Sequence, residues 1–170
     1  DASFTLSSAN ECQSGTDAIA TITGTAGGAF TSTPAGLTIN AGTGLIDVSA
    51  STANSYTVTY TTTGACFANS NQAITIVADE DPTYSYSSTS ECQSGTDMTA
   101  TITGTAGGAF TATPAGLTIN AGTGLIDVSA STANSYTVTY TTPGTCSASL
   151  IIPVTINADE DATFSYLSGT

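Results

Sequence analysis

The sequence predicts an all-β protein built from tandem immunoglobulin-like β-sandwich modules. Three observations lead to this fold class. Apolar and polar residues alternate over short stretches, turn-forming residues separate these stretches, and the whole pattern returns after 80 residues. The alternating stretches are rich in Thr, Val, Ile, Tyr and Phe, which favour strands over helices.

The repeat runs through the chain without a gap. Residues 1–80 match residues 81–160 at 60 of 80 positions, and residues 161–170 start the unit again with DATFSYLSGT. A period of this length is too long for one coil of a solenoid and fits a small sandwich domain. We therefore expect one module over 1–80 and a second over 81–160. Residues 161–170 should form the first strand of a third module, or a strand donated to a neighbouring chain.

Alternation within the first module predicts which side chains face the core. Gly, Pro and Asn clusters mark turns about every 8 to 12 residues, which leaves room for about six or seven strands. The residues expected to point inward are Phe4, Leu6, Ile22, Phe30, Leu37, Ile39, Ile46, Val48, Ala50, Tyr56, Val58, Tyr60, Ile74 and Ile76.

Residues 33–62, TPAGLTINAGTGLIDVSASTANSYTVTYTT, return unchanged at 113–142. This segment resembles the bacterial immunoglobulin-like and cadherin-like repeats of very large surface proteins, which share an aGLtin..TG.I hairpin followed by sYTVtYt. The resemblance implies tandem extracellular modules at the cell surface, as in adhesin stalks and surface fibres, often stiffened by calcium at module junctions. The sequence departs from the cadherin linker pattern, so calcium ligands cannot be carried over from that family.

The charge of the chain excludes two classes of partner. It has 13 Asp and Glu residues, no Lys, Arg or His, and a formal net charge of −13. Nothing in it can neutralise a phosphate, so we expect no binding to nucleic acid. No stretch approaches the roughly 20 apolar residues of a membrane-spanning helix, so we expect no direct membrane insertion.

Four cysteines, Cys12, Cys66, Cys92 and Cys146, are the candidates for disulfides. The chain lacks His and metal-type cysteine spacing, so zinc binding and an imidazole-activated thiol are not expected. Two connectivities are open. Repeat symmetry favours Cys12–Cys66 and Cys92–Cys146 within the modules, and this is the pairing that we prefer. Immunoglobulin-like topology, however, places Cys12 and Cys66 at opposite poles and favours Cys12–Cys146 across the junction.

The acidic residues are the candidate metal ligands. The segment ADED, at 78–81 and again at 158–161, places three carboxylates side by side at each module junction, where they repel one another. A solvated acidic surface is the simplest interpretation, and it accounts well for the isolated Asp47. The alternative is a cation site, and with only oxygen ligands on offer it would suit Ca²⁺.

We expect the linker acids to meet the acids of the loop that follows the first strand. A calcium ion bound there would lock neighbouring modules into a rod. The candidate ligands are Asp79, Glu80, Asp81, Glu11 and Asp17 and, 80 residues later, Asp159, Glu160, Asp161, Glu91 and Asp97.

These observations predict an extracellular structural repeat protein on the cell surface, either the calcium-stabilised stalk of a large adhesin or the building block of a surface fibre. Its partners would be neighbouring copies or further repeats of itself, with any glycan or cell-surface target bound through other domains. An enzyme is not expected, because nothing in the sequence suggests a cleft. The alternative is a polysaccharide-binding module that uses exposed Tyr and Asn, although the chain has no Trp to form a sugar platform.

Overall fold

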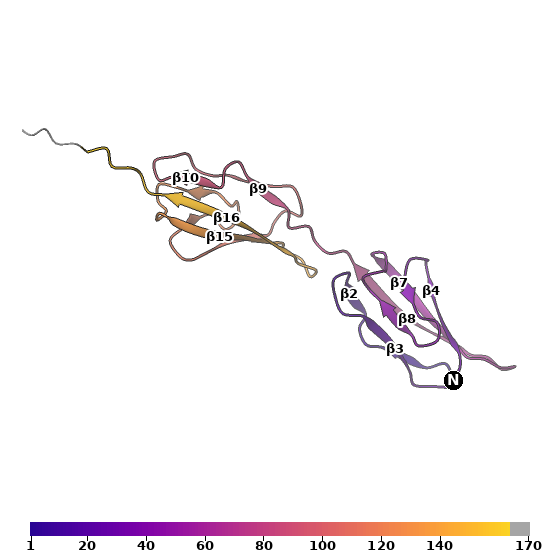
Figure 1. Ribbon diagram of the computed structural model, residues 1–170. Helices are drawn as coiled ribbons and strands as arrows, with labels where there is room; N and C mark the ends of the chain where they lie inside the picture. The colour runs from indigo at the N-terminus through magenta and orange to yellow at the C-terminus, as the bar shows by residue number, and fades with distance from the viewer. Residues whose placement is uncertain (164–170) are drawn as a thin grey trace, which may run out of the picture. The chain divides into compact units, whose positions relative to one another are not determined.

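The computed structural model describes residues 1–163 and confirms the all-β fold class, since every regular element in this range is a β-strand (Figure 1). The chain divides into two compact units, Asp1–Asp79 and Glu80–Thr170. This division falls one residue before the end of the first repeat. The last seven residues of the segment 161–170, and with them the predicted first strand of a third module, lie outside the described residues.

The first unit is a sandwich of two four-stranded sheets, with strand orders β1-β3-β6-β5 and β2-β8-β7-β4. Its strands are β1 (Phe4–Leu6), β2 (Asn10–Cys12), β3 (Ala18–Ile22), β4 (Ala29–Thr33), β5 (Thr38–Ile39), β6 (Leu45–Asp47), β7 (Asn54–Thr61) and β8 (Asn69–Val77).

The second unit repeats this arrangement. One sheet has the order β10-β16-β15-β12, and the other is interrupted, so that it appears as the pairs β11-β9 and β13-β14 with an isolated bridge between Met98 and Ile126. The strands are β9 (Tyr84–Tyr86), β10 (Ser90–Cys92), β11 (Ala100–Ile102), β12 (Ala109–Thr113), β13 (Thr118–Ile119), β14 (Ile126–Asp127), β15 (Asn134–Thr141) and β16 (Ser149–Asn157).

The first strand of each unit is divided between the two sheets. In the first unit β1 pairs antiparallel with β3, whereas β2 pairs parallel with β8 and aligns Cys12 with Val77 (Figure 1). This division explains why each unit has eight strands where about six or seven were expected. Because β2 and β8 run in the same direction, both end at the same pole of the unit.

We call this end the exit pole. The opposite end, where β8 begins after its turn from β7, is the entry pole. Asp1 lies at the entry pole, because its carbonyl accepts a hydrogen bond from Thr25, and the Thr25 carbonyl accepts one from Tyr60 near the end of β7. The chain therefore enters each unit at one pole and leaves it at the other.

The core lies between the two sheets, as the alternation predicts. The Phe4 ring on β1 meets the Phe30 ring on β4 edge to face, with centroids 5.4 Å apart across the sandwich. Ala50 is a wrong prediction, since it is exposed: β6 ends at Asp47 and the chain turns away from the core. The remaining predicted inward residues of the first unit are buried or half-buried.

The buried tyrosines of the first unit have their hydroxyl groups satisfied. Tyr60 donates to the Thr25 carbonyl at 2.9 Å and accepts from the Gly28 N–H at 2.8 Å, while Tyr56 donates to the Thr52 carbonyl at 2.6 Å. These bonds connect the two ends of β7 to loops that take no part in the strand pairing. Unpaired, each hydroxyl would cost about 1–3 kcal/mol on burial.

Truncating a core side chain should destabilise a unit by far more than truncating an exposed one. Ile76 on β8 is 1 % exposed, whereas Ile19 on β3 is 45 % exposed. We expect Ile76→Ala to lower the free energy of unfolding by about 2–5 kcal/mol and the matched control Ile19→Ala by less than about 1 kcal/mol. Urea denaturation of both variants measures the two losses, and equal losses would contradict the assigned core.

Candidate functional site

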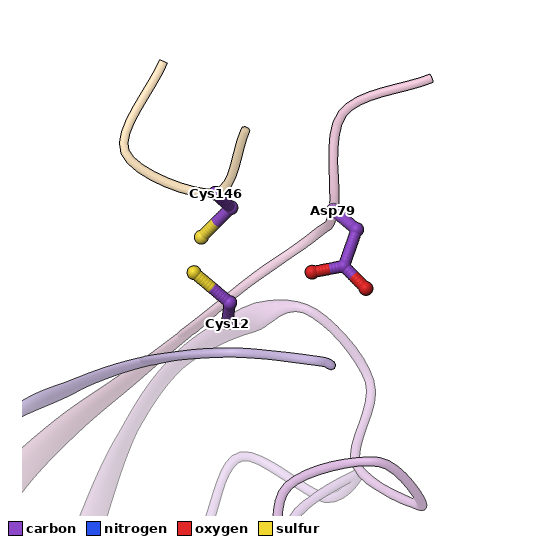
Figure 2. Close-up of side chains that lie close together, drawn as sticks. All are labelled: Cys12, Asp79 and Cys146. Atoms are coloured by element: carbon purple, nitrogen blue, oxygen red, sulfur yellow. The ribbon is translucent and has the colours of Figure 1, made fainter. Parts of the chain in front are cut away.

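At the exit pole of the first unit, the loop after β2 binds the side chain of Asp79. The Asp79 carboxylate accepts hydrogen bonds from the Ser14 N–H at 3.2 Å and the Ser14 hydroxyl at 2.9 Å. Figure 2 shows Asp79 beside Cys12, with a carboxylate oxygen within 4.8 Å of the Cys12 sulfur. The linker is therefore bound to the loop that carries Cys12.

The second unit forms the same exit pole from its own residues. The Asp159 carboxylate accepts from the Ser94 N–H at 3.0 Å and the Ser94 hydroxyl at 2.8 Å. The Gln93 N–H donates to the Asn157 carbonyl at 3.0 Å, as the Gln13 N–H does to Val77 in the first unit. Repeated sequence has produced repeated geometry.

The other acids that were expected in this loop are placed differently. Asp17 accepts from the Val48 N–H at 3.2 Å and so anchors the loop to the segment after β6, and Asp97 does the same with Val128 at 3.1 Å. Glu11 lies on β2, next to the tight turn at Gly15. Asp17 thus has a structural partner of its own.

At the entry pole of the second unit, Glu80 binds the turn between β15 and β16. Its N–H donates to the Cys146 carbonyl at 3.0 Å, and its carboxylate accepts from the Gly144 N–H at 3.0 Å. A Cβ at position 144 would lie 1.9 Å from Glu80 Oε1, so any larger residue there would displace this carboxylate. Glu80 therefore fixes the linker against the turn that carries Cys146.

Asp81 begins the second unit with a local turn. It accepts from the Thr83 hydroxyl and from the Thr83 N–H, the latter at 3.0 Å, and these two bonds, the hydroxyl bond first, hold the pKa of its carboxyl below the ordinary value. Asp1 forms the same pair of bonds with Ser3. A short Asp-x-Ser/Thr motif of this kind favours such turns, and it is the sequence signal that our interpretation of these acids missed.

Asp47, interpreted from the sequence as surface charge, also organises a turn, and so does Asp127 in the second unit. Asp47 accepts from the Ser49 hydroxyl at 2.8 Å and the Ala50 N–H at 2.9 Å, and Asp127 accepts from Ser129 and Ala130 at the same distances. The Ala50 and Ala130 N–H bonds, followed by the serine hydroxyl bonds, hold the pKa of both carboxyls below the ordinary value. Backbone N–H and hydroxyl groups therefore take the place of cationic partners.

The acidic residues offer the ligand type that a hard cation prefers, but within each unit the described ones are not close enough together to form a site. The acids offer only oxygen, and the disulfide-bonded Cys12 has no thiolate to give. Within either unit, however, no three carboxylates of the described residues have oxygens within 4.8 Å of one another. The hydrogen bonds above still leave lone pairs on each carboxylate, since a carboxylate accepts at about four sites.

The preferred disulfide pairing was wrong. Cys66 and Cys92 are free and exposed, whereas Cys12 and Cys146 are disulfide-bonded. Cys12 aligns with Val77 at the end of β8, but Cys66 precedes Asn69 at its start. Eight residues of strand separate these levels by about 27 Å. A disulfide needs Cα atoms within about 7 Å, so the Cys12–Cys66 pair cannot form.

Comparisons with known proteins do not assign the chain to a family. No protein-family model and no curated protein matches it. The fold is similar to that of cadherin extracellular domains. Drosophila N-cadherin EC1-4 matches with 10 % identity and a TM-score of 0.40, over 89 % of this chain and 47 % of that one. Human CDH23 EC21-23 matches with 13 % identity and a TM-score of 0.40, over 88 % and 66 %.

Mouse cadherin-23 EC22-24 gives a similar result, with 13 % identity and a TM-score of 0.37 over 93 % of this chain and 67 % of that one. The chain thus spans about half to two-thirds of the length of these structures. Likenesses this weak carry no argument about fold or function. The fold class rests on the strand pairing and the core described above.

Other features of the described residues bear on the remaining functions. No pocket is present in residues 1–163. Within the same range no helix has the length and apolar character needed to cross a membrane. The tyrosines Tyr56, Tyr60, Tyr84, Tyr136 and Tyr140 are buried and are therefore not available as a sugar-binding platform.

The lowered pKa values of Asp47 and Asp127 predict a pH-dependent contribution to stability. A carboxyl whose pKa is lowered by folding stabilises the folded state above its unfolded value, here about 3.8, and loses that contribution as the pH falls through the folded pKa. We expect the double variant Asp47→Ala, Asp127→Ala to melt below the wild type at pH 7, with the difference shrinking toward pH 2.5. A difference that stays constant over this range would contradict the assigned role.

Proposed function

We propose that this chain is a segment of an extracellular structural protein whose modules are joined end to end, as in an adhesin stalk or a surface fibre. The observation that carries this proposal is the parallel pairing of β2 with β8 and of β10 with β16. It makes each module accept the chain at one pole and release it at the other, which suits an indefinite series. The same module is used twice with little change.

We infer that Cys12 and Cys146 bond to each other and staple the two modules. Two further facts support this pairing. Cys12 lies beside Asp79 within the first unit, and the Cys146 carbonyl accepts the Glu80 N–H within the second. Asp79 and Glu80 are consecutive residues, and each is bound beside one of the two cysteines, which supports this pairing. In the chain-entropy model, closing a ring over residues 12–146 stabilises the protein by about 5 kcal/mol.

A structural disulfide also supports the extracellular location. Disulfides persist in oxidising compartments and are rare in the cytosol of most organisms. A surplus of carboxylates without any Lys or Arg agrees with a surface exposed to solution ions. Cell-surface placement and bacterial origin remain part of the proposal.

Calcium is the proposed source of further stiffness at the junction. Asp79, Glu80 and Asp81 are consecutive, and each keeps lone pairs beyond those used by its hydrogen-bond partners. Glu11 lies at the same pole as Asp79 and would add a further carboxylate. Water and carbonyl oxygens would complete the 6 to 8 ligands that calcium takes. Asp159, Glu160, Asp161 and Glu91 would serve the next junction in the same way, with Asp17 and Asp97 as outer ligands.

Calcium should raise the melting temperature more than sodium chloride of equal ionic strength. Extracellular calcium modules bind with dissociation constants of about 0.1–1 mM, so about 10 mM calcium should add about 1.4–2.7 kcal/mol. The double variant Asp79→Asn, Asp81→Asn should lose this gain. The control Asp47→Asn, Asp127→Asn removes the same charge and should keep it. Equal melting temperatures of the wild type in calcium and in EDTA with sodium chloride would remove the calcium part of the proposal.

The pairing of Cys12 with Cys146 can be tested by peptide mapping. Unfolded, non-reduced protein treated with iodoacetamide should carry label on Cys66 and Cys92 only. Digestion with a protease specific for Asp and Glu should then yield a linked peptide containing Cys12 and Cys146. Trypsin is unsuitable because the chain has no Lys or Arg. A Cys12–Cys66 linked peptide would refute the staple.

A further inference from the structure

The two free cysteines occupy the same structural positions as the two oxidised ones. Cys92 ends β10 and aligns with Asn157 at the end of β16, as Cys12 ends β2 and aligns with Val77. Both of these cysteines lie at an exit pole, next to an aspartate bound by a serine. Cys92 therefore stands at its exit pole as Cys12 does, but as an exposed thiol.

Cys66 likewise repeats the setting of Cys146. Each lies in the turn that follows the seventh strand of its unit, at the entry pole. The Thr62 N–H donates to Ala68 at 2.9 Å to close the first turn, and the Thr142 N–H donates to Ala148 at 3.0 Å to close the second. Cys66 is nevertheless an exposed thiol, whereas Cys146 is disulfide-bonded.

The two turns differ in backbone conformation, since φ is +113° at Gly64 and is not positive at Gly144, and they also differ in their surroundings. Glu80 fills the space beside Gly144, whereas a Cβ at Gly64 would meet no atom within 4 Å. The entry pole of the first unit is thus open at the position where the second unit receives a linker glutamate. The exit pole of the second unit carries that glutamate, Glu160, directly after Asp159.

The start of the next module is also present in the described residues. Asp161 accepts the Thr163 N–H at 2.9 Å, as Asp81 accepts Thr83 and Asp1 accepts Ser3, both at 3.0 Å. The turn that opens each of the two modules therefore forms again after Glu160. Both poles needed for another junction are present, one at each end of the pair of modules.

We propose that Cys66 and Cys92 are the two halves of further junction disulfides, each formed with the matching cysteine of another module of this repeat. Cys92 bonds the cysteine at the Cys66 position of a following module, and Cys66 bonds the cysteine at the Cys92 position of a preceding one. The inference rests on the Cys12–Cys146 staple proposed above and extends it from one junction to a series.

The reaction is thiol–disulfide exchange with a small-molecule disulfide as the electron acceptor. One protein thiol first exchanges with oxidised glutathione and forms a mixed disulfide, which releases one glutathione thiol. The thiolate of the partner cysteine then attacks the protein sulfur and releases the second glutathione as thiolate, which takes a proton from solvent. Two protein thiols are oxidised to one disulfide, and one oxidised glutathione is reduced to two thiols.

Two complementary variants test the direction of the bond. Cys66→Ser keeps only the Cys92 thiol, and Cys92→Ser keeps only the Cys66 thiol. In a glutathione redox buffer we expect a mixture of the two variants to form a covalent dimer that stops at two chains. Each variant alone should stay monomeric, and the wild type should form a ladder of head-to-tail oligomers on a non-reducing gel. Mapping of the dimer should give a linked peptide that joins Cys66 to Cys92.

A fused chain, residues 1–160 followed by residues 1–170, distinguishes a further repeat of the same polypeptide from a separate copy. A bond between Cys92 and the second Cys66 in the fusion, without dimers in the mixture, assigns the junction to repeats within one chain. Dimers in the mixture assign it to separate copies as well. Absence of the bond in both arms would overturn the inference, as would dimers formed equally well by either variant alone.

The labelling experiment on Cys66 and Cys92 separates this failure from a failure of the staple. Suppose that Cys66 and Cys92 are labelled and Cys12 and Cys146 are not. Absence of the Cys66–Cys92 bond in both the variant mixture and the fused chain then refutes only the further junction disulfides. If Cys12 or Cys146 is labelled, the Cys12–Cys146 staple itself is refuted.

Discussion

The parallel pairing of β2 with β8 is the constraint on which the rest of the structure depends. It carries the first strand across from the sheet of β3 to the sheet of β8, so that Cys12 and the departing linker finish at the same pole. It also places the turn of Cys66 about 27 Å away, at the other end of β8. The separation of Cys12 from Cys66 and the direct contact of Asp79 with the loop after β2 follow from this one register, and the proposed end-to-end use of the module rests on it.

The staple would change how tension passes through the protein. A bond between Cys12 and Cys146 connects residues 1–12 directly to residues 146–170. Force applied to the two ends would then pass through residues 1–12 and 146–170, and residues 13–145 would not be extended. With such bonds at successive junctions, tension would run through the first and last strands of the modules and leave most of each core unloaded. Hydrogen bonds and calcium would then set only the bending stiffness of the junction.

Much of the fold could be predicted because one face of each strand is buried. Tyr56, Val58 and Tyr60 alternate inward along β7 as the period of two requires. The division of the first strand could not be predicted, because the three small residues between β1 and β2 show no pattern that marks a change of sheet. The prediction that Ala50 faces the core failed for a related reason. The turn that begins at Asp47 ends β6, but its sequence continues the alternation of the strand.

The sites were harder to predict than the fold. The acids were expected to gather around a cation, but in the described residues Asp17, Asp79, Glu80 and Asp81 each bind a backbone N–H or a hydroxyl. Almost every residue has a backbone N–H, so the sequence does not indicate which of these groups will bind a carboxylate. The preferred cysteine pairing failed because it relied on repeat symmetry, which says nothing about the pole at which each cysteine lies. The pairings within and between modules are distinguished only by which end of β8 or β16 each cysteine lies beside.

Stretching single molecules by their ends tests the junction staple most directly. In the oxidised protein the account predicts that only the chain outside residues 12–146 lengthens, with no unfolding step of a whole module. After reduction it predicts two steps that each release about 250 Å of chain, one for each module of 80 residues. Two whole-module steps in the oxidised protein, or two partial steps shortened by a loop within each module, would contradict it.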